Sequence, residues 1–280
     1  MRTLLNGRDA DAVAVADRGL QYGDGLFETI AVRAGQALLW HAHLRRLTRG
    51  LTALGLPAVD IDVLESEVNQ VIAGADHGVL KVLLTAGTGG RGYSRATQPV
   101  CNRVVSLHPF PDHPLDRWVD GVRVRVCETR LAVQPRLAGI KHCNRLEQVL
   151  ARSEWSDPMI AEGLMLDMGG CLTEGTMSNV FGVRGNRILT PSLTNCGVHG
   201  VMRETMLSVA EDVGYLVEFL DAPLADWRDV DELFLTNSVI GLWPVREVED
   251  RLVGPGPVSR MLQRHLAEAG AAAMPIPDGG

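Results

Sequence analysis

The segment His108-Pro-Phe-Pro-Asp-His-Pro114 places three prolines within seven residues of a 280-residue chain. Proline has no backbone N–H and a fixed φ angle, so this segment can form neither a helix nor a central strand. A chain of this length is compatible with one or two domains, and the interruption favours two. We therefore expect a small N-terminal domain at residues 1–110, a Pro-rich linker at 111–118 and a larger domain at 119–280.

Composition places the chain among ordinary globular proteins, because 46% of its residues are hydrophobic and 22% are charged. The net charge of −7 disfavours nucleic acid and anionic membrane surfaces as partners. No apolar run approaches the roughly 18 residues of a membrane helix. Asp9 and Asp11 stand where a signal peptide would be apolar. We expect a cytoplasmic protein without a membrane partner, disordered only in its Pro/Gly-rich C-terminal tail.

The five cysteines are odd in number, widely spaced and free of any Cys-x-x-Cys pair. This spacing argues against a disulfide framework and against a zinc site. We expect five buried free thiols and no metal.

Hydrophobic periodicity changes repeatedly between strand-like and helical on both sides of the linker, which predicts an α+β fold. Before the linker, we expect strands at 12–16, 26–32, 79–85 and 104–107 and helices at 41–54 and 63–72. After it, we expect strands at 122–126, 164–168, 180–183, 187–190, 233–236 and 245–248, and helices at 144–155, 200–213 and 258–267.

Lys141 is one of only two lysines in the chain, the other being Lys81, and it lies just before a predicted helix. Arginine stays protonated, whereas a buried lysine can lose its proton and form a Schiff base with a carbonyl group. Lys141 is therefore a candidate nucleophile. Taken alone, its rarity is better explained by chance survival in an Arg-rich composition.

Other segments offer groups that could hold an anionic cofactor. Glu174 follows a Gly-Gly turn, Gly200 opens a predicted helix with unpaired amides, and Thr236-Asn-Ser238 ends a predicted strand. Arg45 lies on the first long helix. Each also has an ordinary structural explanation, such as a solvated carboxylate, a turn glycine or an exposed helix face.

Taken together, these motifs resemble the fold-type IV pyridoxal-phosphate enzymes, which include aminodeoxychorismate lyases, branched-chain aminotransferases and D-amino-acid aminotransferases. The resemblance covers nearly the whole chain, and the order and approximate spacing of its motifs both fit. It is carried by Asp17–Gly19, Tyr22–Thr29, His43–Leu47, Lys141–Gln148, Glu174–Asn179, Gly200–Arg203 and Thr236–Val245.

The resemblance implies a two-domain α+β fold with pyridoxal 5'-phosphate between the domains, and a homodimer. It implies that Lys141 is the catalytic Schiff-base lysine and that Glu174 partners the pyridine nitrogen. The positions that match phosphate-binding residues are Arg45, the backbone of Val201 and Met202, Asn237 and Ser238. Met202 replaces a threonine common in the aminotransferases, so its backbone amide alone must serve.

Within this family, the strings Lys141–Gln148 and Gly89–Tyr93 look most like the lyases. This likeness implies the conversion of 4-amino-4-deoxychorismate to 4-aminobenzoate and pyruvate, a step of folate biosynthesis, with Lys141 removing the proton. Arg91 and Tyr93 would then bind substrate carboxylates. Loop statistics equally allow Gly89–Gly92 to be a flexible surface loop. By the same likeness, Asn144 and Arg145 would lie near the cofactor ring oxygen.

Two alternatives remain open from the sequence. The first is a D-amino-acid or branched-chain aminotransferase on the same fold, because the cofactor residues do not separate these reactions. The second is a cofactor-free binding protein that retains the framework, against which stands the presence of both Lys141 and Glu174.

Overall fold

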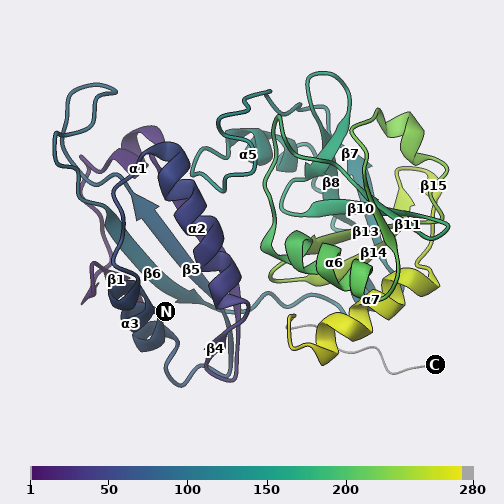
Figure 1. Ribbon diagram of the computed structural model, residues 1–280, viewed down its shortest axis with the longest axis horizontal. Helices are drawn as coiled ribbons and strands as arrows, with labels where there is room; N and C mark the ends of the chain where they lie inside the picture. Colours follow the sequence, from purple (N-terminus) through teal and green to yellow (C-terminus); the bar gives the residue numbers. More distant parts are fainter. Residues whose placement is uncertain (1, 273–280) are drawn as a thin grey trace. The chain divides into compact units, whose positions relative to one another are not determined.

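The computed structural model describes residues 2–272, which form two compact units (Figure 1). The first unit extends to Pro111 and also includes Ile140–Asn144. The second unit comprises Asp112–Gly139 and the chain from Arg145 onward. The sequence-based division assigned residues 140–144 to the larger domain, whereas these five residues group with the first unit. The C-terminal tail expected to be disordered lies outside the described residues.

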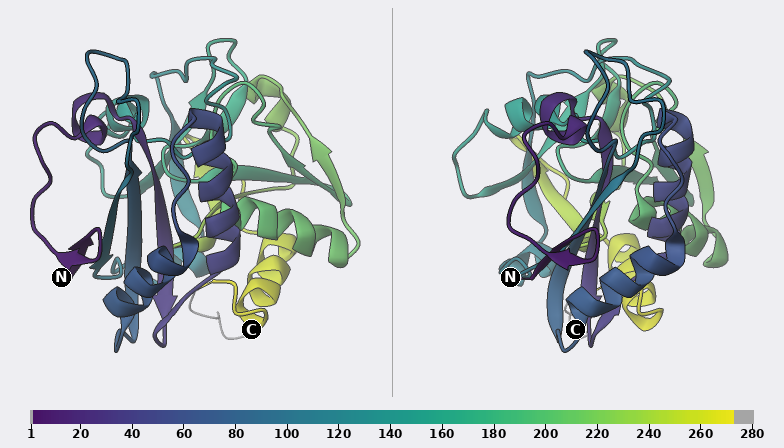
Figure 2. Two further views of the ribbon diagram at one scale, coloured as in Figure 1. Left: turned by 60° about the vertical axis from the view of Figure 1, so that its left-hand side comes forward. Right: turned by 90° about the vertical axis from the view of Figure 1, so that its left-hand side faces the viewer.

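The first unit is built on a six-stranded sheet with the strand order β2-β1-β6-β5-β3-β4. Two helices, α2 and α3, cover the same face of this sheet (Figures 1 and 2). Its elements are β1 (Thr3–Leu5), β2 (Arg8–Asp9), α1 (Arg18–Tyr22), β3 (Gly25–Arg33), β4 (Gln36–Ala37), α2 (Trp40–Leu54), α3 (Ile61–Ile72), β5 (His77–Thr85) and β6 (Asn102–His108).

Alternation along β3 sorts its side chains between the two faces of the sheet. Leu26, Ile30 and Val32 are buried in the core formed with α2 and α3. Phe27 and Thr29 point to the opposite face, because successive residues of a strand alternate. The leucine spacing of α2 serves the same core, and α2 ends at Gly55, whose φ of 61° suits glycine.

The strand expected at residues 12–16 was a wrong prediction, because this segment is irregular and Val15 is 84% exposed. Period-2 alternation produces a strand only where a neighbouring strand can pair with it. Here the chain instead leads into α1. That helix begins at Arg18 and is capped by Asp17, whose carboxylate accepts hydrogen bonds from the backbone of Gly19 and from Thr85 Oγ1.

The second unit is built on a nine-stranded mixed sheet, in which β12-β11-β10-β13-β14-β7-β8-β9 follow one another and β15 pairs with β14. Its elements are α4 (Asp116–Val119), β7 (Val122–Val126), α5 (Leu146–Arg152), β8 (Ile160–Leu166), β9 (Leu172–Gly175), β10 (Asn179–Arg184), β11 (Arg187–Thr190), α6 (Val201–Asp212), β12 (Leu216–Phe219), the 3₁₀ helix η1 (Leu224–Trp227), β13 (Glu232–Asn237), β14 (Gly241–Val248), β15 (Arg251–Leu252) and α7 (Pro257–Glu268).

Most of the predicted elements are confirmed, including the antiparallel hairpin of β10 and β11. The helix expected at 144–155 is shorter and forms only α5. Its Leu146, Val149 and Leu150 are 74%, 56% and 59% exposed. The opposite side of α5 presents the fully buried Ala151 to a small core. The apolar spacing therefore marked a helix but not its buried face.

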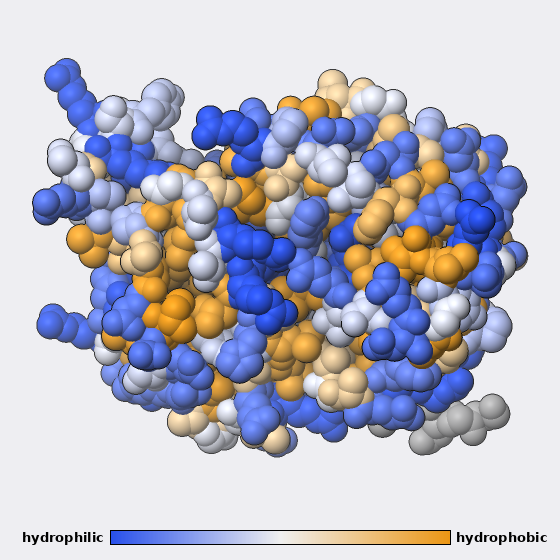
Figure 3. All heavy atoms as spheres, in the orientation of Figure 1, coloured by the Kyte–Doolittle hydropathy of each residue, from blue (hydrophilic) through white to orange (hydrophobic). Residues whose placement is uncertain are grey.

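The five cysteines are free thiols, of which Cys143 and Cys171 are only partly buried. The expectation of burial was therefore wrong for these two. No helix in residues 2–272 is long and apolar enough to cross a membrane. The face of the molecule shown in Figure 3 mixes hydrophilic residues (blue) with hydrophobic ones (orange).

Candidate active site

Lys141 is held against the edge of β3 by backbone hydrogen bonds. Its carbonyl oxygen accepts from Phe27 N at 3.0 Å, and Cys143 N donates to Gly25 O at 2.9 Å. Leu26 and His142 form the antiparallel bridge between these two bonds. Residues opposite each other in antiparallel strands share a sheet face. Lys141 therefore lies on the face of Phe27, and its Nζ is 4.4 Å from the centre of the Phe27 ring.

Lys81 reaches the same aromatic ring from the neighbouring strand. It pairs with Thr29 across β3 and β5, and its Nζ is 5.6 Å from the centre of the Phe27 ring. Sequence reasoning gave Lys81 no role, because it lies in a predicted strand with no proposed cofactor residue nearby in the sequence. The register of β3 and β5 brings both lysines of the chain to one ring.

A buried ionic cluster connects β3 to α2 on the other face of the sheet. Glu28 Oε2 lies 2.6 Å from His43 Nδ1, and Glu28 Oε1 accepts from Arg46 Nε at 2.8 Å. Burial alone would raise the pKa of Glu28, but the Arg46 guanidinium outweighs it and lowers that pKa to about 2. An ionised carboxylate only accepts, so His43 carries its proton on Nδ1.

Its surroundings favour the neutral form of His43. Burial lowers its pKa despite the Glu28 carboxylate, and the positive charges of Arg46 and Lys141 lower that pKa further. The cluster and the sheet segment that carries Lys141 thus influence each other electrostatically within the first unit. Sequence reasoning did not select Glu28, His43 or Arg46 as site residues.

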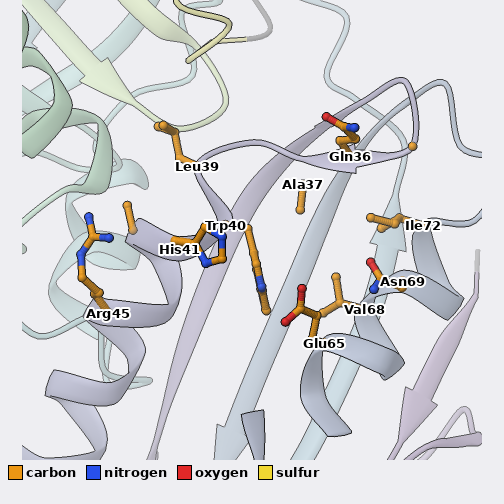
Figure 4. A pocket seen from close by; sticks show the side chains of 12 residues that line it. Gln36, Ala37, Leu39, Trp40, His41, Arg45, Glu65, Val68, Asn69 and Ile72 are labelled. Atoms are coloured by element: carbon orange, nitrogen blue, oxygen red, sulfur yellow. The ribbon is translucent and has the colours of Figure 1, made fainter. Parts of the chain in front are cut away.

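Arg45 and Arg46 are neighbours in sequence but differ in surroundings. Arg45 is exposed at the edge of a 690 Å³ pocket, together with Trp40 and His41 of α2 and Glu65 of α3 (Figure 4). Arg46 is only 6% exposed and bonds Glu28. A helical signal distinguishes the two arginines, because Arg46 follows the buried His43 by three residues and so shares its face.

In the second unit, Glu174 lies near the end of β9 and is 4% exposed. Its Oε2 accepts a hydrogen bond from Val198 N at 2.8 Å. Gly197 precedes Val198 with a φ of 84°. A Cβ atom at this glycine would lie 3.2 Å from Glu174 Oε2 and 2.8 Å from the Leu193 side chain. Glycine therefore permits the close approach that aims the Val198 amide at the carboxylate.

The N-terminus of α6 supplies backbone donors. Gly200 precedes the helix without a side-chain cap, and Val201 and Met202 are each 1% exposed. The first amides of a helix have no intrahelical acceptor and carry partial positive charge. Buried amides of this kind suit a phosphate group.

The end of β13 contributes a third set of polar groups. Asn237 donates from Nδ2 to Met177 O at 3.1 Å, and its Oδ1 accepts from the backbone of Val239 and Ile240. Its side chain therefore shapes this turn. Thr236 Oγ1 is buried and has no hydrogen-bond partner among the described residues. Ser238, two residues later in the sequence, carries another hydroxyl that a phosphate could use.

The Gly-rich loop is tied down by a buried arginine. The Arg18 guanidinium donates to the carbonyl oxygens of Gly92 and Tyr93 at 3.1 Å each and of Ser94 at 3.3 Å. Arg91 is exposed, and Tyr93 is 89% exposed with its ring 5.6 Å from that of Tyr22. The loop backbone is thus anchored, and its two predicted substrate side chains project from it.

The remaining predicted residues flank the lysine segment. Asn144 donates from Nδ2 to Gly23 O at 3.1 Å, within the first unit. The chain returns to the second unit at Arg145, the residue immediately before α5. The predicted residues therefore divide between the units: Arg45, Arg91, Tyr93, Lys141 and Asn144 belong to the first, and Arg145, Glu174, Val201, Met202, Asn237 and Ser238 to the second.

Metal binding was not expected from the sequence. Within residues 2–272, no group of three or more His, Cys, Asp or Glu side chains is placed to hold a metal ion. The groups described above are instead an amine, a buried carboxylate and a set of backbone and hydroxyl donors.

Comparisons with known proteins place these groups in a family context. The pattern of the amino-transferase class IV family matches residues 25–248. Over 267 residues the chain is 38% identical to the aminodeoxychorismate lyase of Vibrio harveyi, covering 94% of this chain and 98% of that protein.

Solved structures agree with this placement. The crystal structure of 4-amino-4-deoxychorismate lyase from Pseudomonas aeruginosa superposes with a TM-score of 0.93 at 44% identity, covering 96% of this chain and 99% of that one. The pyridoxal-phosphate-bound form of a hypothetical aminotransferase from Mycobacterium tuberculosis gives a TM-score of 0.83 at 22% identity, covering 97% and 99%. The second likeness concerns the fold alone.

Proposed function

The chain belongs to the class IV aminotransferase family, and from this premise we propose that it is a 4-amino-4-deoxychorismate lyase. The proposed reaction releases pyruvate from 4-amino-4-deoxychorismate and leaves 4-aminobenzoate, a step of folate biosynthesis. The observation that carries this proposal is similarity over nearly the full chain, at 38% and 44% identity, to two proteins named for that activity. The aminotransferase structure compared above is more distant, at 22% identity.

Enzymes of this family use pyridoxal 5'-phosphate, and the residues of this chain fit it. The buried amides of Val201 and Met202 and the unpartnered Thr236 hydroxyl suit its phosphate. When bound, the cofactor supplies an aldehyde for an amine and a protonated ring that takes up negative charge.

Lys141 performs two tasks in this proposal. Its amine would hold the cofactor through the aldehyde and would become free once a substrate amine takes its place. The released amine then removes the proton from the amine-bearing carbon of the substrate. Departure of enolpyruvate completes an aromatic ring, which makes the overall reaction strongly favourable. The backbone pairing with β3 and the Phe27 ring hold Nζ in place for both tasks.

Glu174 holds a proton at the pyridine nitrogen of the cofactor. The Val198 amide binds one of its oxygens, which orients the carboxylate. A positioned anion keeps the ring nitrogen protonated and so stabilises charge that develops after proton removal.

Several residues are proposed for anion binding. Arg45, Asn237 and Ser238 join the α6 amides as phosphate contacts, and Arg91 and Tyr93 bind substrate carboxylates. The anchored backbone of the Gly-rich loop supports this last role, because a fixed loop presents its side chains at a lower entropic cost. Asn144 and Arg145 are proposed to lie near the ring oxygen of the cofactor.

The decisive experiment supplies the purified protein with enzymatically made 4-amino-4-deoxychorismate and measures 4-aminobenzoate and pyruvate. Equal amounts of the two products without an added amino acid support the lyase. Absence of both products, with 2-oxo acid formed from D-alanine or leucine, would identify an aminotransferase instead. Protein that stays colourless after incubation with pyridoxal 5'-phosphate would favour a cofactor-free binding protein.

We also propose that the protein is a cytoplasmic homodimer. The free thiols are those of a reducing compartment. The exposed Leu146, Val149 and Leu150 give α5 an apolar surface of the kind that subunit contacts cover. Sedimentation analysis tests the assembly. A monomer at the concentration of the activity assay would contradict it.

A further inference from the structure

Glu162 of β8 is a buried carboxylate to which no role has yet been given. It is 1% exposed. Its Oε1 accepts from Gly163 N at 2.9 Å, from Thr176 N at 3.1 Å and from the Thr176 hydroxyl. Its Oε2 accepts from Met177 N at 3.1 Å and from Ser178 Oγ at 2.8 Å. Four of these five donors belong to one turn, residues 176–178, which follows β9.

Glu162 acts as the hydrogen-bond acceptor for this turn. A backbone N–H can only donate, so both carboxylate oxygens serve as acceptors. The Met177 amide donates to Glu162, and the Thr176 amide is shared between Glu162 at 3.1 Å and Gly163 O at 3.0 Å. Glu162 therefore binds two backbone amides and two hydroxyl groups of the turn, in addition to the backbone bond from Gly175 N to Ser178 O at 2.7 Å.

The turn lies between two residues that both bond the backbone of Val198. Glu174 precedes the turn and accepts from Val198 N at 2.8 Å. Asn179 follows the turn and donates from Nδ2 to Val198 O at 2.9 Å. Val198 is therefore held through both its N–H and its carbonyl group, three residues before α6 begins at Val201.

The same turn also reaches the end of β13. Met177 O accepts from Asn237 Nδ2 at 3.1 Å, and Asn237 Oδ1 in turn binds the next two backbone amides of its own turn. Residues 174–179 thus include Glu174, and they bond both Val198, three residues before α6, and Asn237 at the end of β13.

We propose that Glu162 is a positioning residue for the cofactor site: by holding the 176–178 turn, it places Glu174, the N-terminus of α6 and Asn237 relative to one another. This inference rests on the proposed function, because it concerns binding of pyridoxal 5'-phosphate. Glu162 itself touches neither substrate nor cofactor in this role.

The main test is Glu162→Gln. The glutamine side chain keeps the size of the glutamate. Its NH₂ group can only donate, so the backbone amides that bonded the replaced oxygen lose their acceptor. We expect the dissociation constant of pyridoxal 5'-phosphate, measured by absorbance titration of the apoprotein, to rise about 10- to 100-fold, as when outer partners of metal ligands are removed. We also expect the pH titration of the cofactor absorbance to shift, since Glu174 is displaced.

Glu232→Gln is the matched control. Glu232 is 3% exposed and accepts from Val258 N and Ser259 N, both at 2.8 Å, at the start of α7. It is thus an equally buried carboxylate with backbone donors, but it binds no part of residues 174–179. We expect Glu232→Gln to lower thermal stability and leave cofactor affinity and its pH titration unchanged. Equal losses of affinity in both variants would overturn the positioning role.

Thr176→Val keeps the inference testable if Glu162→Gln does not fold. This change removes one hydroxyl donor to Glu162 and preserves side-chain shape, so we expect a several-fold weaker affinity, on the order of one hydrogen bond. Thr190→Val, which removes a buried hydroxyl bonded to Val180 O, is its control. Wild-type affinity in Thr176→Val would contradict the proposal.

The proposed function and the role of Glu162 fail in different ways. Wild-type protein that neither binds pyridoxal 5'-phosphate nor makes 4-aminobenzoate would reject the proposed function and this inference with it. Wild-type protein that does both, beside a folded Glu162→Gln variant with unchanged cofactor affinity, would reject the inference alone.

Discussion

At the scale of single residues, Phe27 is the point where the two lysines of the chain meet. The Nζ atoms of Lys141 and Lys81 lie 4.4 and 5.6 Å from its ring centre. An aromatic face attracts both ammonium groups, while the like charges repel each other. Their proposed roles nevertheless differ, because only Lys141 is part of the lysine motif of the family.

The first prediction separates these lysines. Lys141→Arg retains the charge but has no amine that can bond an aldehyde. We expect activity to fall by at least about 10²- to 10⁴-fold, the usual contribution of a positioned base. Borohydride treatment should fix no cofactor to this variant. Lys81→Arg is the control and should still be labelled at Lys141, as mass spectrometry of the peptides would show. Labelling at Lys81 in the wild type would refute the assignment.

The second prediction concerns phosphate contacts on α2. If Arg45 binds the cofactor phosphate, Arg45→Ala should weaken pyridoxal 5'-phosphate binding about 10- to 100-fold, as for a hydrogen bond to a charged group. Arg49→Ala, one turn later and also exposed, should bind normally. Absorbance titration of the apoproteins gives both constants. Unchanged affinity in Arg45→Ala would transfer the role to the buried Arg46.

At the scale of elements, the cluster of Glu28, His43 and Arg46 connects β3 to α2. Its pKa values make this connection dependent on pH. Glu28 has a folded pKa of about 2, below its ordinary 4.5. The unfolded chain therefore takes up a proton in a range where the folded protein does not. The stabilisation is complete above pH 4.5 and is lost as pH falls towards 2.

The third prediction follows from the lowered pKa of Glu28 in the folded protein. Glu28→Gln should lower the free energy of unfolding near neutral pH by on the order of 3 kcal/mol, because Arg46 loses its buried partner. The difference from wild type should shrink as pH falls below 4.5, as urea unfolding at several pH values would show. Asp11→Asn, an exposed change in the same unit, should follow the wild type throughout. A constant difference across this range would contradict the pKa of Glu28.

At the scale of the whole molecule, the chain passes three times between the two units: after Pro111, after Gly139 and after Asn144. Gly139 has a φ of 76°, and its N–H and carbonyl group bond Gly197 O and His199 N at 2.9 and 3.2 Å. Two residues later, Lys141 pairs with β3. Neither unit is therefore a simple fragment of the sequence.

The fourth prediction tests this crossing. Gly139→Ala should cost about 1–2 kcal/mol in unfolding free energy for its positive φ, and its Cβ would lie 3.1 Å from His199 Cγ. Gly170→Ala has a similar φ of 83° and no atom within 4 Å, so it should show the backbone cost alone. We expect only Gly139→Ala to reduce the fraction of Lys141 trapped by borohydride. Equal trapping in both variants would show that the crossing does not position the lysine.

Features that depend on local periodicity and on motif order could be predicted from the sequence. The leucine spacing of α2, the hairpin of β10 and β11, and the position of Lys141 just before α5 follow from neighbouring residues. The family could also be recognised from the sequence, because its cofactor-binding residues occur in short motifs that follow one another in a fixed order. The assignment of individual site residues stays a prediction.

Contacts between side chains that are distant in sequence became visible only in the fold. The register of β3 with β5 brought Lys81 to Phe27, and the packing of α2 buried Arg46 while leaving Arg45 exposed. Residues 12–16 alternate without becoming a strand, and no local pattern marked Glu162 as the acceptor for a turn 14 residues away. A periodic pattern shows which residues share one face of a helix or strand. What packs against that face depends on distant residues, which only the fold brings into contact.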